Sequence, residues 1–302
     1  MSEHGFLLVD KPKGWTSFDV CGRLRRIFGI KRVGHTGTLD PFATGLLVVA
    51  LGKATKLIPF FEKDVKTYET MIRFGVMSDT LDPEGIVTTQ EGKVQAVKGA
   101  EIEKVLSEVF MGKITQIPPK YSALKINGKK MYELARAGEE FEVKPRETEI
   151  HAVELLKLEY PDARIRITAS AGFYVRSFAR DLAEVLGTCG ICWELRRTEV
   201  GDISISTNKF TVYQQNQLKE GNRSDFALID PSEILALPSY EIKTERLDDF
   251  HCGRAFPFES DQVLTQVDLD ASQRIPFLIR HEAKTIGLAV LQFEKLHPRT
   301  VF

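Results

Sequence analysis

The sequence predicts a globular chain of the α/β (α+β) class, in which both strands and helices build the core. The apolar run 46–51 stops at Gly52 and is typical of a buried strand. Residues 163–169 alternate polar and apolar side chains, which predicts a half-buried strand. Residues 101–111 repeat apolar side chains at helical spacing, which predicts an amphipathic helix. At 302 residues, with 43% hydrophobic and 27% charged side chains, the chain has room for one large and one small domain.

The N-terminal residues predict a strand, a turn and a helix. Residues 6–9 are typical of a short buried strand, and the Pro/Gly turn 10–14 follows it. A capping threonine or serine predicts a helix over residues 16–28, which Gly29 stops. The chain start has no basic segment followed by an apolar core, and the apolar runs are too short to span a bilayer, so we expect a cytoplasmic protein without membrane contact.

The loop 34–47 contains the strongest candidate for a catalytic side chain. Its three glycines allow left-handed backbone or close approach, and Pro41 pushes Asp40 toward an extended conformation. Asp40 is therefore presented on a stiff turn that leads into the apolar run. A carboxylate in this position is either a turn residue or a catalytic acid, and local composition alone favours the turn.

A further strand is predicted over residues 66–74, and Tyr68 lies on its apolar face. A strand tyrosine commonly packs in a core, and the alternative is a platform on which an unpaired base stacks. The acid-rich segment 75–85 lacks the regular spacing and closing glutamate of a calcium loop, so we predict no metal there. From its local sequence, Asp82 in this segment is a turn residue.

Basic side chains gather on either side of the Asp40 loop although the net charge is −1. Residues 11–32 and 120–136 are each strongly basic, whereas residues 201–250 carry more acidic than basic side chains. A polyanion would therefore bind the N-terminal two-thirds of the chain. Each basic run could equally be a solvated surface, and composition leaves both interpretations open.

Arg176 lies near the start of a predicted helix that extends to Leu186 and ends at Gly187. A buried arginine needs a carboxylate partner. Asp40 is the partner we predict, and the local alternatives are two acids of the same helix, Asp181 and Glu184.

The spacing of Cys189 and Cys192 is that of a metal or redox pair. A structural zinc site needs a second pair, and the remaining cysteines, Cys21 and Cys252, are isolated in the sequence. We therefore expect reduced, structural thiols and no metal site.

Several separated blocks resemble the TruB-type tRNA pseudouridine-55 synthases of bacteria. The motif Gly34-His35-Thr36-Gly37-Thr38-Leu39-Asp40-Pro41, followed by Ala43, Gly45 and Leu46, is similar to the catalytic motif of that family. The other blocks that carry the resemblance are Asp10–Ser17, Lys66–Tyr68, Gly172–Ser177 and Leu195–Thr198. Phe173 departs from the family pattern, which has a small polar residue there. Together the blocks extend over about residues 5–235.

The resemblance implies the pseudouridine synthase fold, a mixed, mainly antiparallel central sheet flanked by helices. It implies a catalytic domain over residues 1–236, with an RNA-gripping insertion at about 120–150. A small, β-rich, PUA-like domain is expected over residues 237–302.

The resemblance also implies an activity, the isomerisation of uridine to pseudouridine at position 55 in the T-loop of tRNA. Asp40 would be the catalytic acid on a flipped-out base, and Arg176 would keep it charged and aimed. The side chain of His35 would fill the gap left by the base, although a general base is the other role open to it. The substrate-binding residues implied in this way are Lys11, His35, Tyr68, Asp82, Tyr174 and Leu195.

The implied reaction changes no oxidation state overall and spends no ATP, so we expect no cofactor. The expected partner is the T-arm stem-loop of tRNA, bound by a monomer. Whether Asp40 attacks the sugar or the base, or removes a ribose proton, stays open in the sequence. The alternative function is a non-catalytic tRNA-binding or tRNA-folding module. A glycoside hydrolase would need two matched carboxylates, and the sequence offers one compelling acid.

Overall fold

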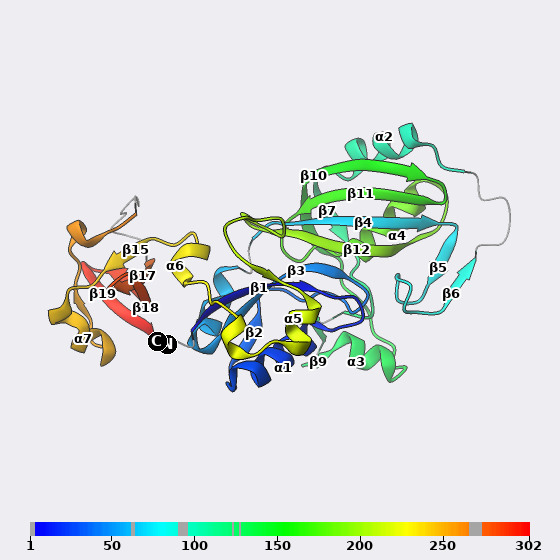
Figure 1. The fold of residues 1–302 in the computed structure, drawn as a ribbon. Helices are drawn as coiled ribbons and strands as arrows, with labels where there is room; N and C mark the ends of the chain where they lie inside the picture. The colour runs from blue at the N-terminus through cyan, green and yellow to red at the C-terminus, as the bar shows by residue number, and fades with distance from the viewer. Residues whose placement is uncertain (1–3, 62–63, 90–95, 123, 127, 266–273) are drawn as a thin grey trace.

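The computed structural model describes residues 4–61, 64–89, 96–122, 124–126, 128–265 and 274–302 (Figure 1). Most of the described chain belongs to one body built on a large twisted sheet. The strands of this sheet are β1 (Gly5–Lys11), β2 (Val33–His35), β3 (Thr44–Leu51), β4 (Lys66–Phe74), β7 (Gly112–Gln116), β10 (Arg146–Glu159), β11 (Asp162–Ala169), β12 (Gly190–Val200), β13 (Ile203–Ser204) and β14 (Val212–Tyr213).

Within the described residues these ten strands follow the order β14-β1-β3-β12-β4-β11-β10-β7, with β2 paired to β3 and β13 to β12. The pairings of β1 with β14 and of β3 with β12 are parallel, and the other pairings are antiparallel. The prediction of a mixed, mainly antiparallel sheet is therefore confirmed. Its two halves are joined through β12, which pairs with both β3 and β4.

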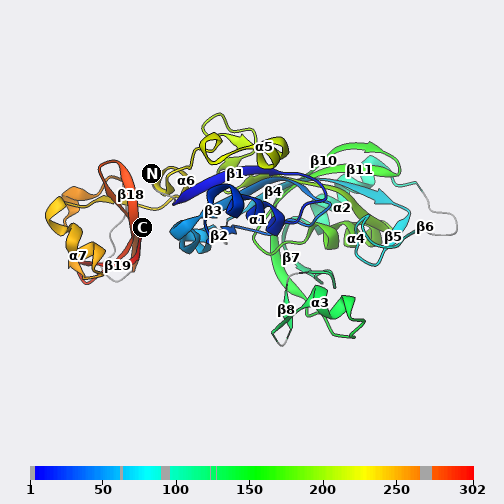
Figure 2. The same ribbon diagram turned by 60° about the horizontal axis from the view of Figure 1, so that its bottom comes forward.

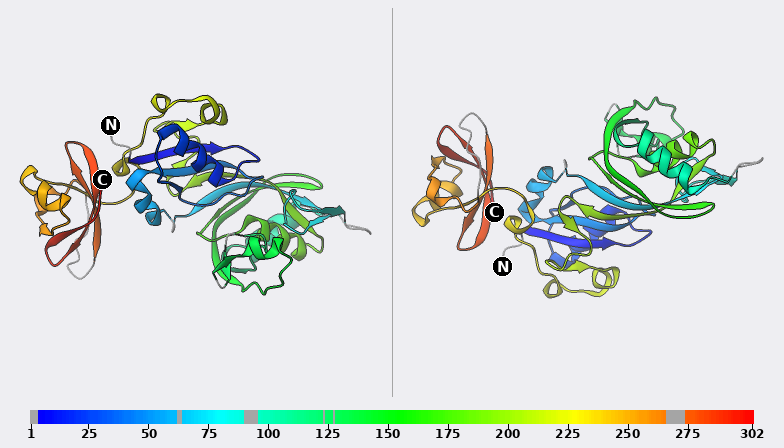
Figure 3. Two further views of the ribbon diagram at one scale, coloured as in Figure 1. Left: turned by 90° about the horizontal axis from the view of Figure 1, so that it is seen from below. Right: turned by 90° about the horizontal axis from the view of Figure 1, so that it is seen from above.

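Helices cover both halves of the sheet (Figure 1 and Figure 3). Their bounds are α1 (Ser17–Phe28), η1 (Gly52–Phe60), α2 (Gly99–Val109), α3 (Met131–Arg136), α4 (Val175–Val185), α5 (Gln215–Glu220), η2 (Arg223–Asp225), α6 (Pro231–Ile234), η3 (Thr244–Arg246), α7 (Leu247–His251) and η4 (Ser260–Gln262). Helix α1 starts and ends as predicted, because the Thr16 side chain caps it and Gly29 adopts φ 65° at its end. The amphipathic helix predicted at 101–111 is α2, in which Ile102 and Leu106 are buried, as is Phe110 directly after it, whereas Val109 is 48% exposed.

Strands β1 and β3 are buried on both faces, which explains their uninterrupted apolar sequence. On one face Leu7 and Val9 pack against α1. On the other face Phe6 and Leu8 join a core cluster that includes Leu278 of the C-terminal sheet. The half of the sheet formed by β4, β11 and β10 packs its apolar face on α2 and α4.

The C-terminal residues form a separate five-stranded sheet within the described part of the chain, in the order β15-β17-β18-β19-β16. Its strands are β15 (Ser239–Glu241), β16 (Phe256–Pro257), β17 (Ile275–His281), β18 (Lys284–Gln292) and β19 (Lys295–Val301). The Asp230 side chain caps α6 at Ser232 and accepts a hydrogen bond from the Thr285 backbone at 2.9 Å, which ties the linker to this sheet. The domain boundary at 236/237 and the PUA-like assignment remain our proposal.

The chain between β7 and β10 projects from the main body (Figure 2). It carries β8 (Lys125–Ile126), β9 (Lys129–Lys130) and α3, and we refer to residues 120–142 as the projection. The predicted RNA-gripping insertion at 120–150 corresponds to the projection plus the start of β10, while Ala123 and Asn127 lie outside the described residues. A second hairpin, β5 (Val76–Ser78) with β6 (Val87–Thr89), follows β4.

Residues 214–230 are polar, which is typical of a loop, yet they contain the short helix α5. All four cysteines lie in the described part of the chain, and none forms a disulfide. Cys192 is fully buried beside Thr70, and burial raises the pKa of its thiol to about 12. In the ranges that the structure describes, none of the helices has the length and apolar character that a bilayer crossing requires.

Candidate active site

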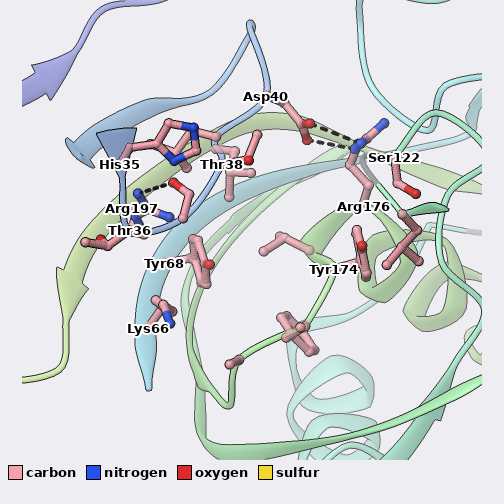
Figure 4. A pocket seen from close by; sticks show the side chains of 18 of the residues that line it. His35, Thr36, Thr38, Asp40, Lys66, Tyr68, Ser122, Tyr174, Arg176 and Arg197 are labelled. Atoms are coloured by element: carbon pink, nitrogen blue, oxygen red, sulfur yellow. Dashed lines mark hydrogen bonds and ion pairs between the residues drawn. The ribbon is translucent and has the colours of Figure 1, made fainter. Parts of the chain in front are cut away.

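A cavity of about 470 Å³ lies where the loop after β2 meets β4, the middle of β12 and the start of α4 (Figure 4). Six of the predicted site residues line it, and they come from segments that are far apart in the sequence. These six are His35, Asp40, Tyr68, Tyr174, Arg176 and Leu195. The fold therefore gathers most of the predicted site around one opening.

Asp40 and Arg176 form the bidentate ion pair drawn in Figure 4. Arg176 Nε lies 2.9 Å from one carboxylate oxygen of Asp40, and Arg176 Nη2 lies 3.1 Å from the other. The predicted partner of Arg176 is thus confirmed, since Asp181 and Glu184 both face Arg180 instead. The Asp40 side chain is 31% exposed while that of Arg176 is 5% exposed, so the carboxylate is open to the cavity and its partner is not.

The Asp40 loop is held from several sides by backbone groups. The Leu39 N–H donates to the Ser17 hydroxyl at 2.9 Å, and the Gly14 N–H donates to the Pro41 carbonyl at 2.8 Å. Gly45 has φ 104°, and a Cβ there would lie 2.2 Å from the Arg197 carbonyl oxygen, so only glycine fits where β3 starts. The loop is therefore fixed before substrate arrives, which is what a preorganised carboxylate requires.

Arg176 has a second carboxylate partner, Asp82. Arg176 Nη1 donates to Asp82 at 3.1 Å and to the Thr80 carbonyl at 2.9 Å, and Arg176 Nη2 donates to the Tyr121 carbonyl at 2.9 Å. The Asp82 side chain is 4% exposed and lies outside the cavity lining, behind the arginine. The structure thus does not bring Asp82 to the position of the substrate contact that the resemblance implies.

Lys11 is also outside the cavity lining and is 0% exposed. Its ammonium donates to three carbonyl oxygens, of Trp15 at 2.6 Å, of Pro12 at 3.1 Å and of Pro41 at 3.3 Å. Burial lowers the pKa of Lys11 to about 8, against the opposite influence of Asp40. In this structure Lys11 links the first turn to the Asp40 loop rather than facing the opening.

The charge of Asp40 is set by two opposed effects. Burial raises the pKa of the Asp40 carboxyl, and the nearby Asp82 charge raises it further. The Arg176 guanidinium lowers the pKa because it stabilises the ionised form. The arginine therefore counteracts the cost of placing a carboxylate in a cavity that a substrate would close.

The walls of the cavity are aromatic and aliphatic. Tyr68 and Tyr174 face one another across it in Figure 4, and Leu195 contributes to the same lining. The Gln116 side-chain amide holds the Tyr174 backbone with two hydrogen bonds, at 3.1 and 3.2 Å. Phe173, the residue that departs from the family pattern, packs against Phe178 with ring centroids 5.9 Å apart and lines the cavity together with Tyr174.

His35 lies across the cavity from Arg176 in Figure 4. Its Nδ1 is buried and lacks a hydrogen-bond partner among the described residues. Burial, followed by the Arg197 charge, lowers the pKa of the imidazole. Both effects favour the uncharged form of the imidazole.

Arg197 lines the cavity as well, and the sequence reasoning gave it no role. It is 1% exposed, and its Nε and Nη2 donate to the carbonyl oxygens of Leu46 at 2.8 Å and Gly37 at 3.1 Å. Burial lowers the pKa of Arg197, while a hydrogen bond with the Tyr68 side chain opposes this effect. The sequence contains a signal for this position, because residues two positions apart on a strand share a face, so Arg197 lies on the same face of β12 as Leu195.

Comparison with known proteins agrees with this geometry. Residues 25–175 match the family described as TruB family pseudouridylate synthase (N terminal domain). The chain belongs to the TruB family. A relative from Caldanaerobacter subterraneus subsp. tengcongensis, named tRNA pseudouridine synthase B, is 37% identical over 303 residues and spans 100% of both chains. This TruB-family chain is therefore a pseudouridine synthase, an isomerase.

Other relatives cover nearly as much of the TruB-family chain. Proteins named tRNA pseudouridine synthase B from Geotalea uraniireducens and Prochlorococcus marinus are 40% and 36% identical to it. They match 88% and 99% of this chain, and 85% and 97% of their own lengths.

Two solved structures share the fold. A chain of the archaeal box H/ACA sRNP Nop10-Cbf5 complex has a TM-score of 0.67 at 21% identity, over 99% of this chain and 86% of that chain. A chain of a Cbf5-Nop10-Gar1 complex has a TM-score of 0.69 at 23% identity, over 99% of this chain and 84% of that chain. At such identities the likeness shows the fold of the TruB-family chain and no more.

Proposed function

We propose that the protein isomerises uridine to pseudouridine at position 55 in the T-loop of tRNA, with Asp40 as the single catalytic carboxylate. The observation that carries the proposal is the bidentate Asp40–Arg176 pair at the edge of a cavity, with the Asp40 side chain 31% exposed. The relatives named tRNA pseudouridine synthase B support the choice of tRNA.

The cavity suits an extruded base. A uridine inside a folded RNA loop must leave its stack before a carboxylate can reach it, at a cost of about a few kcal/mol. The volume of about 470 Å³ is within the usual range of ligand pockets. Tyr68 and Tyr174 offer planar apolar faces to a base, and Leu195 packs beside them.

The chemistry needs one ionised carboxylate and no external reagent. The N-glycosidic bond breaks, the uracil turns, a bond to carbon 5 forms, and the proton from carbon 5 leaves while nitrogen 1 gains one. Attack by Asp40 on the sugar or the base, and proton removal from the ribose, all require the charged form of Asp40. Arg176 supports that form, because it opposes the burial that raises the pKa of Asp40.

The projection is where we propose that the T-arm stem-loop binds. Ser122 and Leu124, at its base, belong to the cavity lining. Its basic side chains are Lys120, Lys125, Lys129, Lys130 and Arg136. Cations on a segment that also contributes to the cavity lining suit a phosphate backbone, whose binding depends on the release of counterions. We further propose that the protein acts as a cytoplasmic monomer.

The test is the release of tritium from tRNA whose uridines carry tritium at carbon 5. We expect the unmutated protein to release it and Asp40→Asn to release none, while tRNA binding stays within about threefold. Asp181→Asn is the matched control, because Asp181 pairs with Arg180 away from the cavity and its loss leaves the active site intact.

Two results would overturn the proposal. Activity of Asp40→Asn close to that of the unmutated protein would remove Asp40 from the chemistry. An unmutated protein that binds tRNA and releases no tritium would be a tRNA-binding or tRNA-folding module instead.

A further inference from the structure

Phe18 is an exposed aromatic residue in the first turn of α1, next to the serine that holds the Asp40 loop. Its side chain is 63% exposed. Single exposed apolar side chains are common on protein surfaces and need no explanation. The neighbours of Phe18 are what make it informative.

The first neighbour is His35. The two rings meet edge to face, with centroids 5.9 Å apart and an interplanar angle of 88°. His35 lines the cavity and Phe18 does not, so the phenyl ring lies next to the cavity wall, one side chain away from the lining.

The second neighbour comes from the projection. Lys130 Nζ lies over the Phe18 ring, 5.9 Å from its centroid, and donates to the Tyr132 hydroxyl at 3.1 Å. A distance of this size is at the outer limit of a cation–π contact, which is about 6 Å. The contact between Lys130 and the ring is therefore weak and easily exchanged for a better partner.

We propose that Phe18 and Lys130 form a further contact for the substrate RNA, outside the cavity, and this rests on the proposed function. The Phe18 ring stacks on an unpaired base next to the target uridine, and Lys130 turns from the ring to the adjoining phosphate. An aromatic face accepts any base, and an ammonium beside it supplies the charge that a phosphate needs. The phenyl ring and the cation come from α1 and β9, so RNA would join the main body to the projection.

The experiment measures the dissociation constant and the single-turnover rate for a T-arm stem-loop RNA whose target uridine carries tritium at carbon 5. We expect Phe18→Ala to weaken binding about 5- to 100-fold, the loss typical of one base stacked on an aromatic ring. Phe18→Trp keeps a stacking face and should bind within about threefold of the unmutated protein. Phe293→Ala is the control, because it removes a phenyl ring that is even more exposed, at 81%, from the tip of the β18–β19 hairpin.

RNAs that lack one base at a time around the target uridine separate stacking from a purely structural role. We expect the Phe18→Ala penalty to vanish for one abasic position and to persist for the others. An equal penalty on every RNA, with a slower single-turnover rate at saturation, would mean that Phe18 only supports His35. Binding by Phe18→Ala equal to that of the unmutated protein would also overturn the proposal.

Lys130 has its own readout. We expect Lys130→Gln to reduce the slope of log Kd against log salt concentration by about one unit, the change that loss of one phosphate contact causes. An unchanged slope would contradict the role given to Lys130. Failure of this inference is distinguishable from failure of the proposed function, because the latter shows as absent tritium release by the unmutated protein.

Discussion

Two arginines line the same cavity and are almost equally buried, yet their partners differ. Arg176 is 4% exposed and meets two carboxylates, those of Asp40 and Asp82. Arg197 is 1% exposed and donates to the carbonyl oxygens of Gly37 and Leu46, and no carboxylate within the described ranges forms an ion pair with it. One guanidinium governs the charge of a side chain, and the other governs the path of the loop that carries it.

The comparison shows that a buried cation can be accommodated in two ways, with different consequences for its removal. Loss of a guanidinium between two carboxylates leaves two like charges close together without compensation. Loss of a guanidinium held by carbonyl oxygens leaves only unpaired acceptors, which cost less. Substitutions at the two sites should therefore differ in both activity and stability.

The largest effect is expected for Arg176→Met. We expect kcat to fall by about 10²- to 10³-fold, because the group that keeps Asp40 ionised and aimed is gone. We expect the free energy of unfolding to fall by about 3–5 kcal/mol, because Asp82 is left buried without a cation. Tritium release and urea unfolding measure the two quantities.

The double variant Arg176→Met with Asp82→Asn separates these effects. It should recover much of the stability and none of the activity, since the buried charge is removed but Asp40 still lacks its partner. Arg180→Met on the same helix is the matched control, and equal losses for it would contradict a specific role of Arg176.

A smaller effect is expected for Arg197→Met. We expect kcat to fall by about 10-fold, because the Gly37 segment loses its anchor and Asp40 is presented less accurately. The free energy of unfolding should fall by about 1–3 kcal/mol, less than for Arg176→Met. Arg196→Met is the control, because the neighbouring arginine pairs with Asp10 and its side chain is 40% exposed. A stability loss for Arg197→Met as large as that for Arg176→Met would contradict the difference that we infer between a guanidinium paired with carboxylates and one paired with carbonyl oxygens.

The smallest expected effect is a shift in the acidic limb of the pH–rate profile. Burial and Asp82 raise the pKa of Asp40, so activity should fall as the pH decreases through a value above that of a free aspartate, which is about 4. Asp82→Asn removes a negative charge beside Asp40 and should move the limb to lower pH. Arg197→Met should leave the limb in place, and a shift there would show that Arg197 also sets the charge of Asp40.

Local sequence predicted those parts of the fold in which neighbouring residues carry the signal. Helix α1 follows from its cap at Thr16 and from Gly29, and β3 follows from an apolar run buried on both faces. Helix α5 carries no apolar periodicity, because five of its six residues are polar and only Leu218 is buried. Val109 has the helical spacing of the apolar residues of α2 and is nevertheless 48% exposed, because spacing alone does not show which positions at the end of a helix find a packing partner.

Local sequence predicted that Asp40 stands on a stiff loop before a buried strand and that Arg176 needs a carboxylate partner, and the resemblance to the TruB family assigned Tyr68, Tyr174 and Leu195 to the same site. These signals are contained in short contiguous motifs, so they can be read without a fold.

Only the tertiary structure decided which groups touch. In it Asp82 pairs with Arg176, and Arg197 donates to carbonyl oxygens. Lys11 is buried at the first turn, and the Phe18 ring contacts both His35 and Lys130. The reason is physical, because burial and pairing depend on groups that the chain brings together from distant positions, and no short motif contains both partners.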